Sequence, residues 1–148
     1  MVGSLTQKSA KLKRIFIEPK LPEALSALAE LAQNLWWSWD HEAIELFKSI
    51  DASQFEAHYY NPLSLLDELG VERANALIAD KQFIATMKRV YTRFRAYIDQ
   101  APPKEGPQIG YFCMEYGLHQ SVRLYSGGLG VLAGDYLKEI SDRNANFV

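Results

Sequence analysis

Residues 125–135 read YSGGLGVLAGD, and this glycine-rich stretch leads directly into an amphipathic run. The run keeps apolar residues at helical spacing, namely Leu132, Tyr136, Leu137 and Ile140. Glycine adopts positive φ freely and lets another group approach the backbone closely. A helix after such a loop presents unpaired N–H groups and the positive end of its dipole, which favours an anion such as phosphate. An ordinary tight turn before a helix gives the same short pattern, so the glycines alone leave both interpretations open.

The stretch before this loop predicts a buried strand. Residues 109–114 read IGYFCM, a continuous apolar run that is typical of a strand covered on both faces in a parallel sheet. Glu115 follows at the carboxyl end of that strand, which is where open α/β sheets bind their ligands. Residues 145–148 read ANFV and predict the start of a second strand. Because one strand would leave an open sheet edge, we expect residues 108–148 to begin an α/β domain and the sequence to be the N-terminal piece of a larger protein.

Residues 20–100 predict a helical N-terminal domain. Pro22 opens a first helix that runs into residue 34, and one apolar stripe follows it at helical spacing. Asp40 and Asp80 stand where their carboxylates would cap helices predicted over 41–50 and 81–100. Gly70 is placed to end a helix predicted over 63–69 as its C-cap.

Two further segments flank this domain. Residues 1–19 are predicted to be a leader and a short extended arm, with RIFI at 14–17 as its β-prone part. Residues 101–107 read APPKEGP and predict a linker, because prolines and glycine cannot extend a helix.

All three tryptophans of the chain lie close together, at Trp36, Trp37 and Trp39. Neighbouring positions of this kind cannot share one helical face, so the rings must contact more than one element. One interpretation is a platform that stacks on sugars, and the other, which we favour, is a hub that joins several helices. His41 follows in the first turn of the next helix without a partner histidine at helical spacing, so we expect no metal site there.

The composition of the 148 residues limits the class of protein. Hydrophobic residues make up 48% and the net charge is -2, which allows a core and lacks the basic excess of a nucleic-acid binder. The last predicted helix carries Lys88, Arg89, Arg93 and Arg95, which we interpret as a solvated face. Cys113 is the single cysteine, which excludes a disulfide framework and fits a cytoplasmic protein. The sequence contains no apolar run near the ~20 residues that span a bilayer, so we expect no membrane partner.

Two parts of the sequence together resemble one enzyme family. Residues 31–39, LAQNLWWSW, are similar to the N-terminal helical region of bacterial and archaeal α-glucan phosphorylases, as are LF at 46–47, ID at 50–51 and NPL at 61–63. Residues 111–119, YFCMEYGLH, resemble the first strand of their catalytic part. Residues 125–135 resemble their glycine loop nearly residue for residue. The resemblance covers about residues 14–148, and the tryptophan cluster and glycine loop in this order form a specific pair.

The resemblance implies a glycosyltransferase that cleaves an α-1,4-glucosidic bond with inorganic phosphate and releases glucose 1-phosphate. It implies two Rossmann-like domains in a GT-B-like fold, and pyridoxal phosphate acting through its phosphate group. It also implies that the backbone of Gly127, Gly128, Leu129 and Gly130 faces the sugar or phosphate, and that Glu115 lies near the phosphate site. The catalytic residues and the cofactor lysine are then expected beyond residue 148, so the fragment alone is predicted to be inactive.

Several points stay open at this level. Arg123 and Leu124 stand where the family usually has an apolar residue and a proline, and residues 142–146 are more polar than usual. Asp135 is explained at least as well by the helix dipole as by a ligand role. A glycogen or starch synthase also has a GGLG loop, but with a lysine shortly before it, where Tyr125 and Ser126 stand here. A glucan-binding helical module is the non-catalytic alternative, and the oligomeric state is left open.

Overall fold

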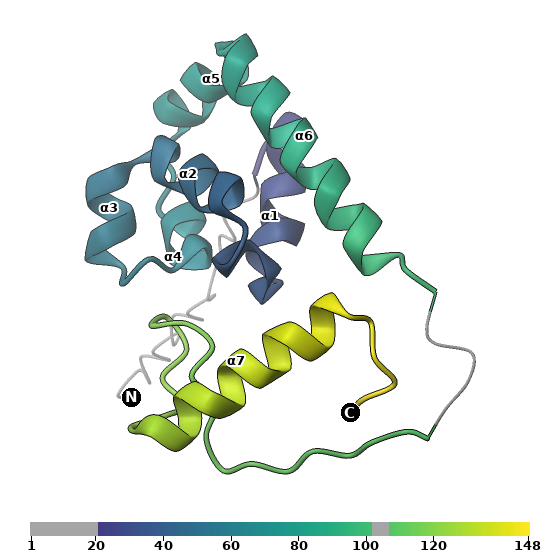
Figure 1. The fold of residues 1–148 in the computed structure, drawn as a ribbon. Helices are drawn as coiled ribbons and strands as arrows, with labels where there is room; N and C mark the ends of the chain where they lie inside the picture. Colours follow the sequence, from purple (N-terminus) through teal and green to yellow (C-terminus); the bar gives the residue numbers. More distant parts are fainter. Residues whose placement is uncertain (1–20, 102–106) are drawn as a thin grey trace, which may run out of the picture.

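The computed structural model describes residues 21–101 and 107–148, and these residues are mostly helical (Figure 1). In chain order the helices are the 3₁₀ helix η1 (Glu23–Leu25), α1 (Ser26–Ala32), the 3₁₀ helix η2 (Leu35–Ser38), α2 (His41–Ile50), α3 (Ala52–Ala57), α4 (Pro62–Asp67), α5 (Val71–Ala79), α6 (Lys81–Ile98) and α7 (Gly128–Asp142). The arm predicted at 14–17 and most of the predicted linker lie outside the described residues.

Short polar side chains set the starts of four α-helices. Asp40 accepts a hydrogen bond from the Ala43 amide at 2.8 Å, and Asp80 accepts from the Gln82 and Phe83 amides. These contacts confirm both predicted N-caps, because each carboxylate satisfies N–H groups that have no partner within the helix. The remaining two caps are Asp51 of α3 and Asn61 of α4.

Two predicted helix ends were wrong. The first helix stops at Ala32, and the side chain of Asn34 accepts from the Trp36 amide at 2.9 Å to begin η2 instead. Gly70 is the N-cap of α5 with φ -67, an ordinary extended conformation, and not the C-cap of α4. α4 ends at Asp67, and the amide of its C-cap residue Glu68 donates to the carbonyls of Ser64 and Leu66, so the helix closes without a left-handed residue.

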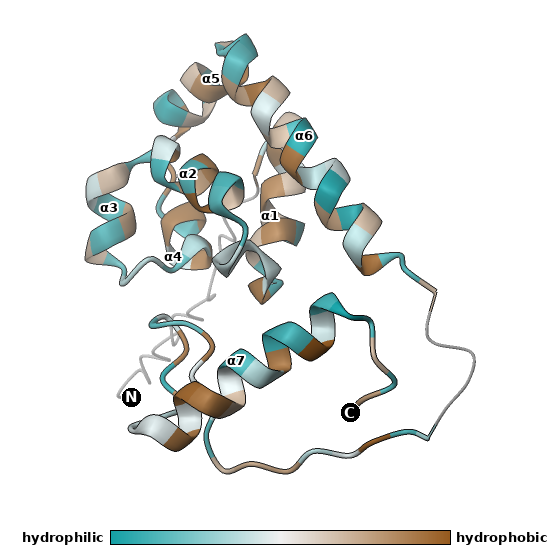
Figure 2. Cartoon of the chain, viewed as in Figure 1, coloured by the Kyte–Doolittle hydropathy of each residue, from teal (hydrophilic) through white to brown (hydrophobic). Residues whose placement is uncertain are grey.

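The tryptophan cluster forms the centre of the helical core. Trp36 and Trp37 are 6% and 1% exposed. The Trp37 ring contacts Phe47 edge-on at 5.7 Å between centroids and lies 6.2 Å from Phe55, so it joins η2 to α2 and α3. Trp36 lies 5.6 Å from Phe94 of α6. The structure therefore confirms the hub interpretation for these two rings, which belong to the buried core cluster. Figure 2 shows apolar (brown) residues on helices α1, α2 and α4 of this domain.

Three arginines of α6 are bound to acidic residues of α1, of α2 and of the N-cap position before α2. Arg93 donates to Asp40 at 2.8 Å and also pairs with Glu42, as Arg89 does. Arg95 pairs with Glu30 of α1 in the same way. Because Arg89 and Arg93 donate hydrogen bonds to its carboxylate, the pKa of Glu42 falls to about 2. These contacts fix α6 against the other helices and leave Lys88 as an exposed basic residue on this helix.

The strand predicted over 109–114 does not form in the described residues. Ile109 and Phe147 make a single parallel bridge, with the Val148 amide donating to the Ile109 carbonyl at 2.8 Å. Phe112 is 97% exposed and Met114 100% exposed. The parallel direction agrees with the prediction, but among the described residues the pairing is limited to 109–111 against 146–148, and Phe112 and Met114 lie uncovered, unlike the side chains of a strand buried on both faces.

The buried face of α7 also differs from the predicted apolar stripe. Gly130, Ala133 and Gly134 are buried, whereas Leu132 and Tyr136 are 68% and 43% exposed. The reason is a close backbone approach by the segment after Glu115, which a side chain on this face would block. A Cβ added at Gly134 would lie 2.3 Å from the carbonyl oxygen of Gly117.

No helix of the described residues is long and apolar enough to cross a bilayer.

Candidate functional site

The glycine loop and Glu115, which the sequence predicts to be neighbours, lie in direct contact. One carboxylate oxygen of Glu115 accepts hydrogen bonds from the backbone amides of Ser126 at 2.9 Å and Gly127 at 3.3 Å. The carboxylate thus occupies part of the positive end of α7, where a negative charge is favoured. Glu115 acts here as an internal anion that fixes the loop.

The four predicted loop amides divide into two engaged and two open groups. The Gly127 amide is held by Glu115, and the Gly130 amide donates to the Gly127 carbonyl at 3.1 Å. For the amides of Gly128 and Leu129, the described part of the chain provides no acceptor. Both residues are exposed, so these two N–H groups at the start of the 15-residue α7 are free to bind an anion from solvent.

Gly130 is needed for space at this site. A Cβ at Gly130 would lie 2.3 Å from the Cβ of Tyr125 and 2.8 Å from the Glu115 carboxylate. A Cβ at Gly127 or Gly128 would meet nothing within 4 Å. The sequence predicts the glycines as a group, but the structure assigns the steric requirement to Gly130.

Three residues that the sequence did not indicate hold this site: His119 and Arg123 contact the helical domain, and Gly117 contacts α7. The ring of His119 contacts Trp37 edge-on at 4.7 Å, and the guanidinium of Arg123 lies 4.7 Å from the ring centre of Tyr59. Gly117 donates its amide to the Gly130 carbonyl at 2.7 Å. These contacts join residues far apart in the chain, so no local sequence pattern marks them.

The electrostatics of His119 follow from its position between the helical domain and α7. Burial lowers its pKa, and the positive charge of Lys138 lowers it further. Its Nδ1 accepts from the Ser121 amide at 3.2 Å and lies 2.9 Å from the Ser121 hydroxyl. The imidazole is therefore held neutral as a packing group at neutral pH.

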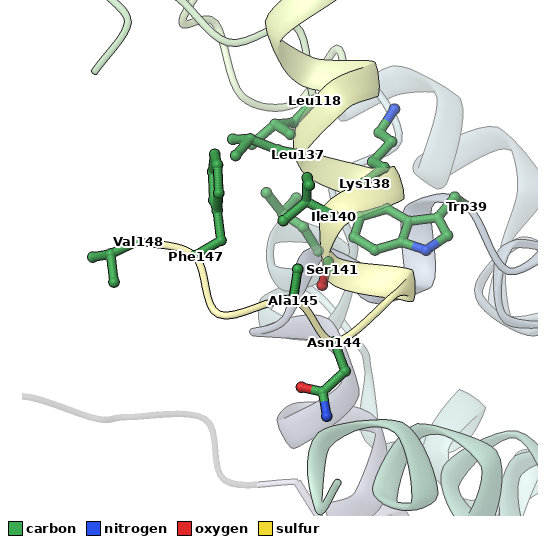
Figure 3. Close-up of a pocket in the computed structure, with 11 residues that line it drawn as sticks. Trp39, Leu118, Leu137, Lys138, Ile140, Ser141, Asn144, Ala145, Phe147 and Val148 are labelled. Carbon is green, nitrogen blue, oxygen red and sulfur yellow. The ribbon is translucent and has the colours of Figure 1, made fainter. Parts of the chain in front are cut away.

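A second feature is a cavity of about 420 Å³ between η2 and the C-terminal half of α7 (Figure 3). Trp39 lines it, and its indole N–H donates to Asp142 at 3.3 Å. Tyr97 contacts the same carboxylate at 2.9 Å. Other lining residues are mainly apolar and include Leu118, Leu137, Ile140 and Phe147. Because Ile140 lies twelve residues after Gly128, roughly 18 Å along the helix, this cavity is separate from the glycine loop.

The other residues weighed from the sequence lie apart from the loop contacts. His41 is exposed at the first position of α2, and Asp135 is exposed on α7. In the described ranges, no group of three His, Cys, Asp or Glu side chains is arranged to hold a metal ion. The lysines of these ranges are Lys48, Lys81, Lys88 and Lys138. Lys138 lies ten residues along α7 from Gly128, roughly 15 Å away, so none of them stands at the loop as an amine for pyridoxal phosphate.

Comparisons with known proteins place this chain in a family. Maltodextrin phosphorylase from Thermococcus litoralis is 41% identical over 133 residues, covering 85% of this chain and 16% of that protein. Glycogen phosphorylase from Aquifex aeolicus is 40% identical over 128 residues, covering 84% and 18%. Glycogen phosphorylase from Mycobacterium tuberculosis is 34% identical over 143 residues, covering 88% and 17%. No solved structure matches the chain significantly.

The chain spans less than one fifth of the length of these relatives. Their names agree with the resemblance carried by the tryptophan cluster and the glycine loop, and thus confirm the α-glucan phosphorylase likeness. A protein family is matched over residues 21–122, from the helical domain into the segment that follows Glu115. The chain therefore belongs to the family described as "Protein of unknown function (DUF3417)".

Proposed function

We propose that this chain is the N-terminal part of an α-glucan phosphorylase, a cytoplasmic hexosyltransferase. The reaction transfers a glucosyl unit from an α-1,4-glucan to inorganic phosphate and releases glucose 1-phosphate. The observation that carries the proposal is the pair of open amides at Gly128 and Leu129, at the start of α7. The names of the relatives support the same activity.

In this proposal the loop residues have different roles. The amides of Gly128 and Leu129 donate to an oxygen of the substrate phosphate or sugar, assisted by the dipole of α7. Gly127 donates its amide to Glu115, and Gly130 leaves room for Tyr125 and Glu115 beside it. Glu115 keeps the loop in place at the edge of the phosphate site. Preorganised donors of this kind stabilise developing charge without having to reorient during the reaction.

Pyridoxal phosphate belongs to the proposal for the longer protein. When bound, the cofactor supplies its own phosphate group for proton transfer at the substrate phosphate. The described residues do not fit the cofactor by themselves, because no lysine of these ranges lies at the loop. We assign the cofactor lysine, cationic phosphate ligands additional to the Gly128 and Leu129 amides, and the second Rossmann-like domain to the part of the relatives that this chain does not span, and we expect residues 1–148 alone to be inactive.

A chimera tests this proposal directly. In maltodextrin phosphorylase from Thermococcus litoralis, the segment that matches this chain is replaced by residues 21–148, and glucose 1-phosphate release from maltodextrin and phosphate is measured. A parallel chimera carries the corresponding Aquifex aeolicus segment as control. Phosphate-dependent release by both chimeras is the expected result. A folded chimera without activity, beside an active Aquifex control, would contradict the proposal.

The two alternatives are weaker on specific grounds. A glucan-binding module that uses all three tryptophans conflicts with the burial of Trp36 and Trp37. Trp39 borders the cavity beside α7, but its N–H is bound to Asp142. The synthase alternative finds no support in the names of the relatives, which are phosphorylases.

A further inference from the structure

Residues 116–125 connect the helical domain to the glycine loop, and we call them the bracket. The bracket is internally bonded: the Tyr116 amide donates to the Leu124 carbonyl at 3.0 Å, and the Val122 amide donates to the His119 carbonyl at 2.9 Å. Ser121 adds two contacts to the His119 ring. The segment is therefore a compact loop with its ends close together, although the chain there has no regular secondary structure.

On one side the bracket contacts two aromatic rings of the helical domain, the buried Trp37 and the exposed Tyr59. His119 packs against Trp37, which is 1% exposed and surrounded by the core aromatics. Arg123 lies over the ring of Tyr59, in a cation–π contact. Tyr59 and Tyr60 both have positive φ, 54 and 57, which is costly for bulky residues and shows that the turn after α3 is held by its surroundings.

On the other side the bracket holds the first turn of α7. The Gly117 amide donates to the Gly130 carbonyl at 2.7 Å, and the backbone of Gly117 packs against Gly134. Directly before the bracket, Glu115 binds the amides of Ser126 and Gly127. The open amides of Gly128 and Leu129 lie between these two attachments along the chain. Their orientation is therefore set by contacts that lead back to the helical domain.

We propose that the helical domain positions the glycine loop through the bracket, with His119 and Arg123 as positioning residues. The inference rests on the proposed function only where it concerns phosphate; the mechanical coupling stands on the contacts alone. The family match covers residues 21–122, which include the helical domain and His119 but neither Arg123 nor the glycine loop.

Amide hydrogen exchange on the 148-residue chain tests the coupling. Arg123→Gln removes the cation over Tyr59, and His119→Ala removes the ring on Trp37. We expect each to speed exchange at the Ser126 and Gly127 amides by roughly threefold or more, as weak anchoring contacts are lost. The amides of Val90 and Phe94 in α6 should keep their protection, which separates loop release from general unfolding.

Two further variants make the test specific. Arg123→Lys keeps a cation near Tyr59 and should restore part of the protection. Arg143→Gln makes the same charge change at the far end of α7, where Arg143 pairs with Glu139, and should leave the loop amides unaffected. Unchanged exchange at Ser126 and Gly127 in both Arg123→Gln and His119→Ala would overturn the proposal.

A titration with inorganic phosphate separates this inference from the proposed function. If the wild-type chain binds phosphate at Gly128 and Leu129, the two bracket variants should raise the dissociation constant by roughly threefold, in step with loop release. If the wild-type chain binds no phosphate but the variants still release the loop, the coupling stands and the phosphate role fails. If the wild-type chain binds phosphate and the variants bind it equally well, the positioning role is wrong.

Discussion

The carboxylate of Glu115 accepts a hydrogen bond from the backbone amide of Ser126, eleven residues later in the chain, with 2.9 Å between Oε2 and the amide nitrogen. This contact places a fixed negative charge at the start of α7, beside the open amides of Gly128 and Leu129. Glu115 therefore occupies the amides of Ser126 and Gly127, and the amides of Gly128 and Leu129 stay open for a ligand.

Replacing Glu115 tests how far this internal anion orders the loop. Glu115→Ala should speed exchange at the Ser126 and Gly127 amides by about tenfold, because hydrogen bonds to a charged acceptor are lost. Glu115→Gln keeps an acceptor oxygen and should have a smaller effect. Glu139→Ala, on the exposed side of α7, is the matched control. Equal exchange rates in Glu115→Ala and wild type would show that the contact does not hold the loop.

Gly134 and Gly128 should respond to alanine in opposite ways. Gly134→Ala sets a methyl group against the Gly117 carbonyl, whose oxygen would lie at 2.3 Å without movement. We expect it to lower the opening free energy of α7 by ~1–3 kcal/mol. Gly128→Ala enters open space at the first turn and should stabilise the helix by ~0.4–1 kcal/mol. Hydrogen exchange along α7 measures both, and a neutral Gly134→Ala would disprove the close approach.

The ion pairs of Glu42 predict a pH dependence of stability. The pKa of Glu42 is about 2, below its ordinary 4.5, because Arg89 and Arg93 donate to its carboxylate. The ionised form thus stabilises the fold, fully above pH 4.5, and this contribution is lost as pH falls toward 2.

Glu42→Gln should remove this contribution. Since the pair is partly exposed and screened, we expect a loss of only ~1 kcal/mol at pH 7 and a flatter profile between the two pKa values. Urea unfolding across this pH range is the measurement. Glu45→Gln on the same helix is the control. If wild type and Glu42→Gln lost the same free energy of unfolding as pH falls below 4.5, the stabilising role of ionised Glu42 would be contradicted.

The hub predicts unequal roles for the tryptophans. Trp37→Ala should cost ~3–5 kcal/mol, because a fully buried ring leaves a cavity among Phe47 and Phe55. Trp39→Ala should cost clearly less, since Trp39 is only partly buried. Chemical unfolding measures both. Comparable losses in the two variants, or a saturable maltodextrin-dependent change in the emission of Trp36 and Trp37, would favour the sugar platform instead.

Local signals allowed much of the helical domain to be predicted. Asp40 and Asp80 are side chains that cap the helix immediately following them, so each prediction needed only neighbouring residues. The hub could be predicted because three large rings, Trp36, Trp37 and Trp39, stand within four positions of the chain. Gly70 misled because a glycine before a helix and a glycine after one look alike in sequence, and here the next helix uses it.

Long-range contacts account for what the sequence did not predict. The apolar stripe of α7 suggested Leu132 and Tyr136 as buried, but Gly117 approaches the opposite, small-residue face. The run 109–114 has the composition of a strand, yet a strand depends on partners that its own residues do not specify. The contacts of His119 and Arg123 with Trp37 and Tyr59 span more than sixty residues and leave no periodic signal.

The most direct test of the account is a titration of the ¹⁵N-labelled 148-residue chain with inorganic phosphate, at constant ionic strength set with chloride. We predict saturable shifts of the Gly128 and Leu129 amide resonances, with smaller changes at Ser126 and Gly127, whose amides are held by Glu115. Shifts that never saturate, or that spread evenly over the chain, would mean that the start of α7 does not receive a phosphate, and would contradict the central claim.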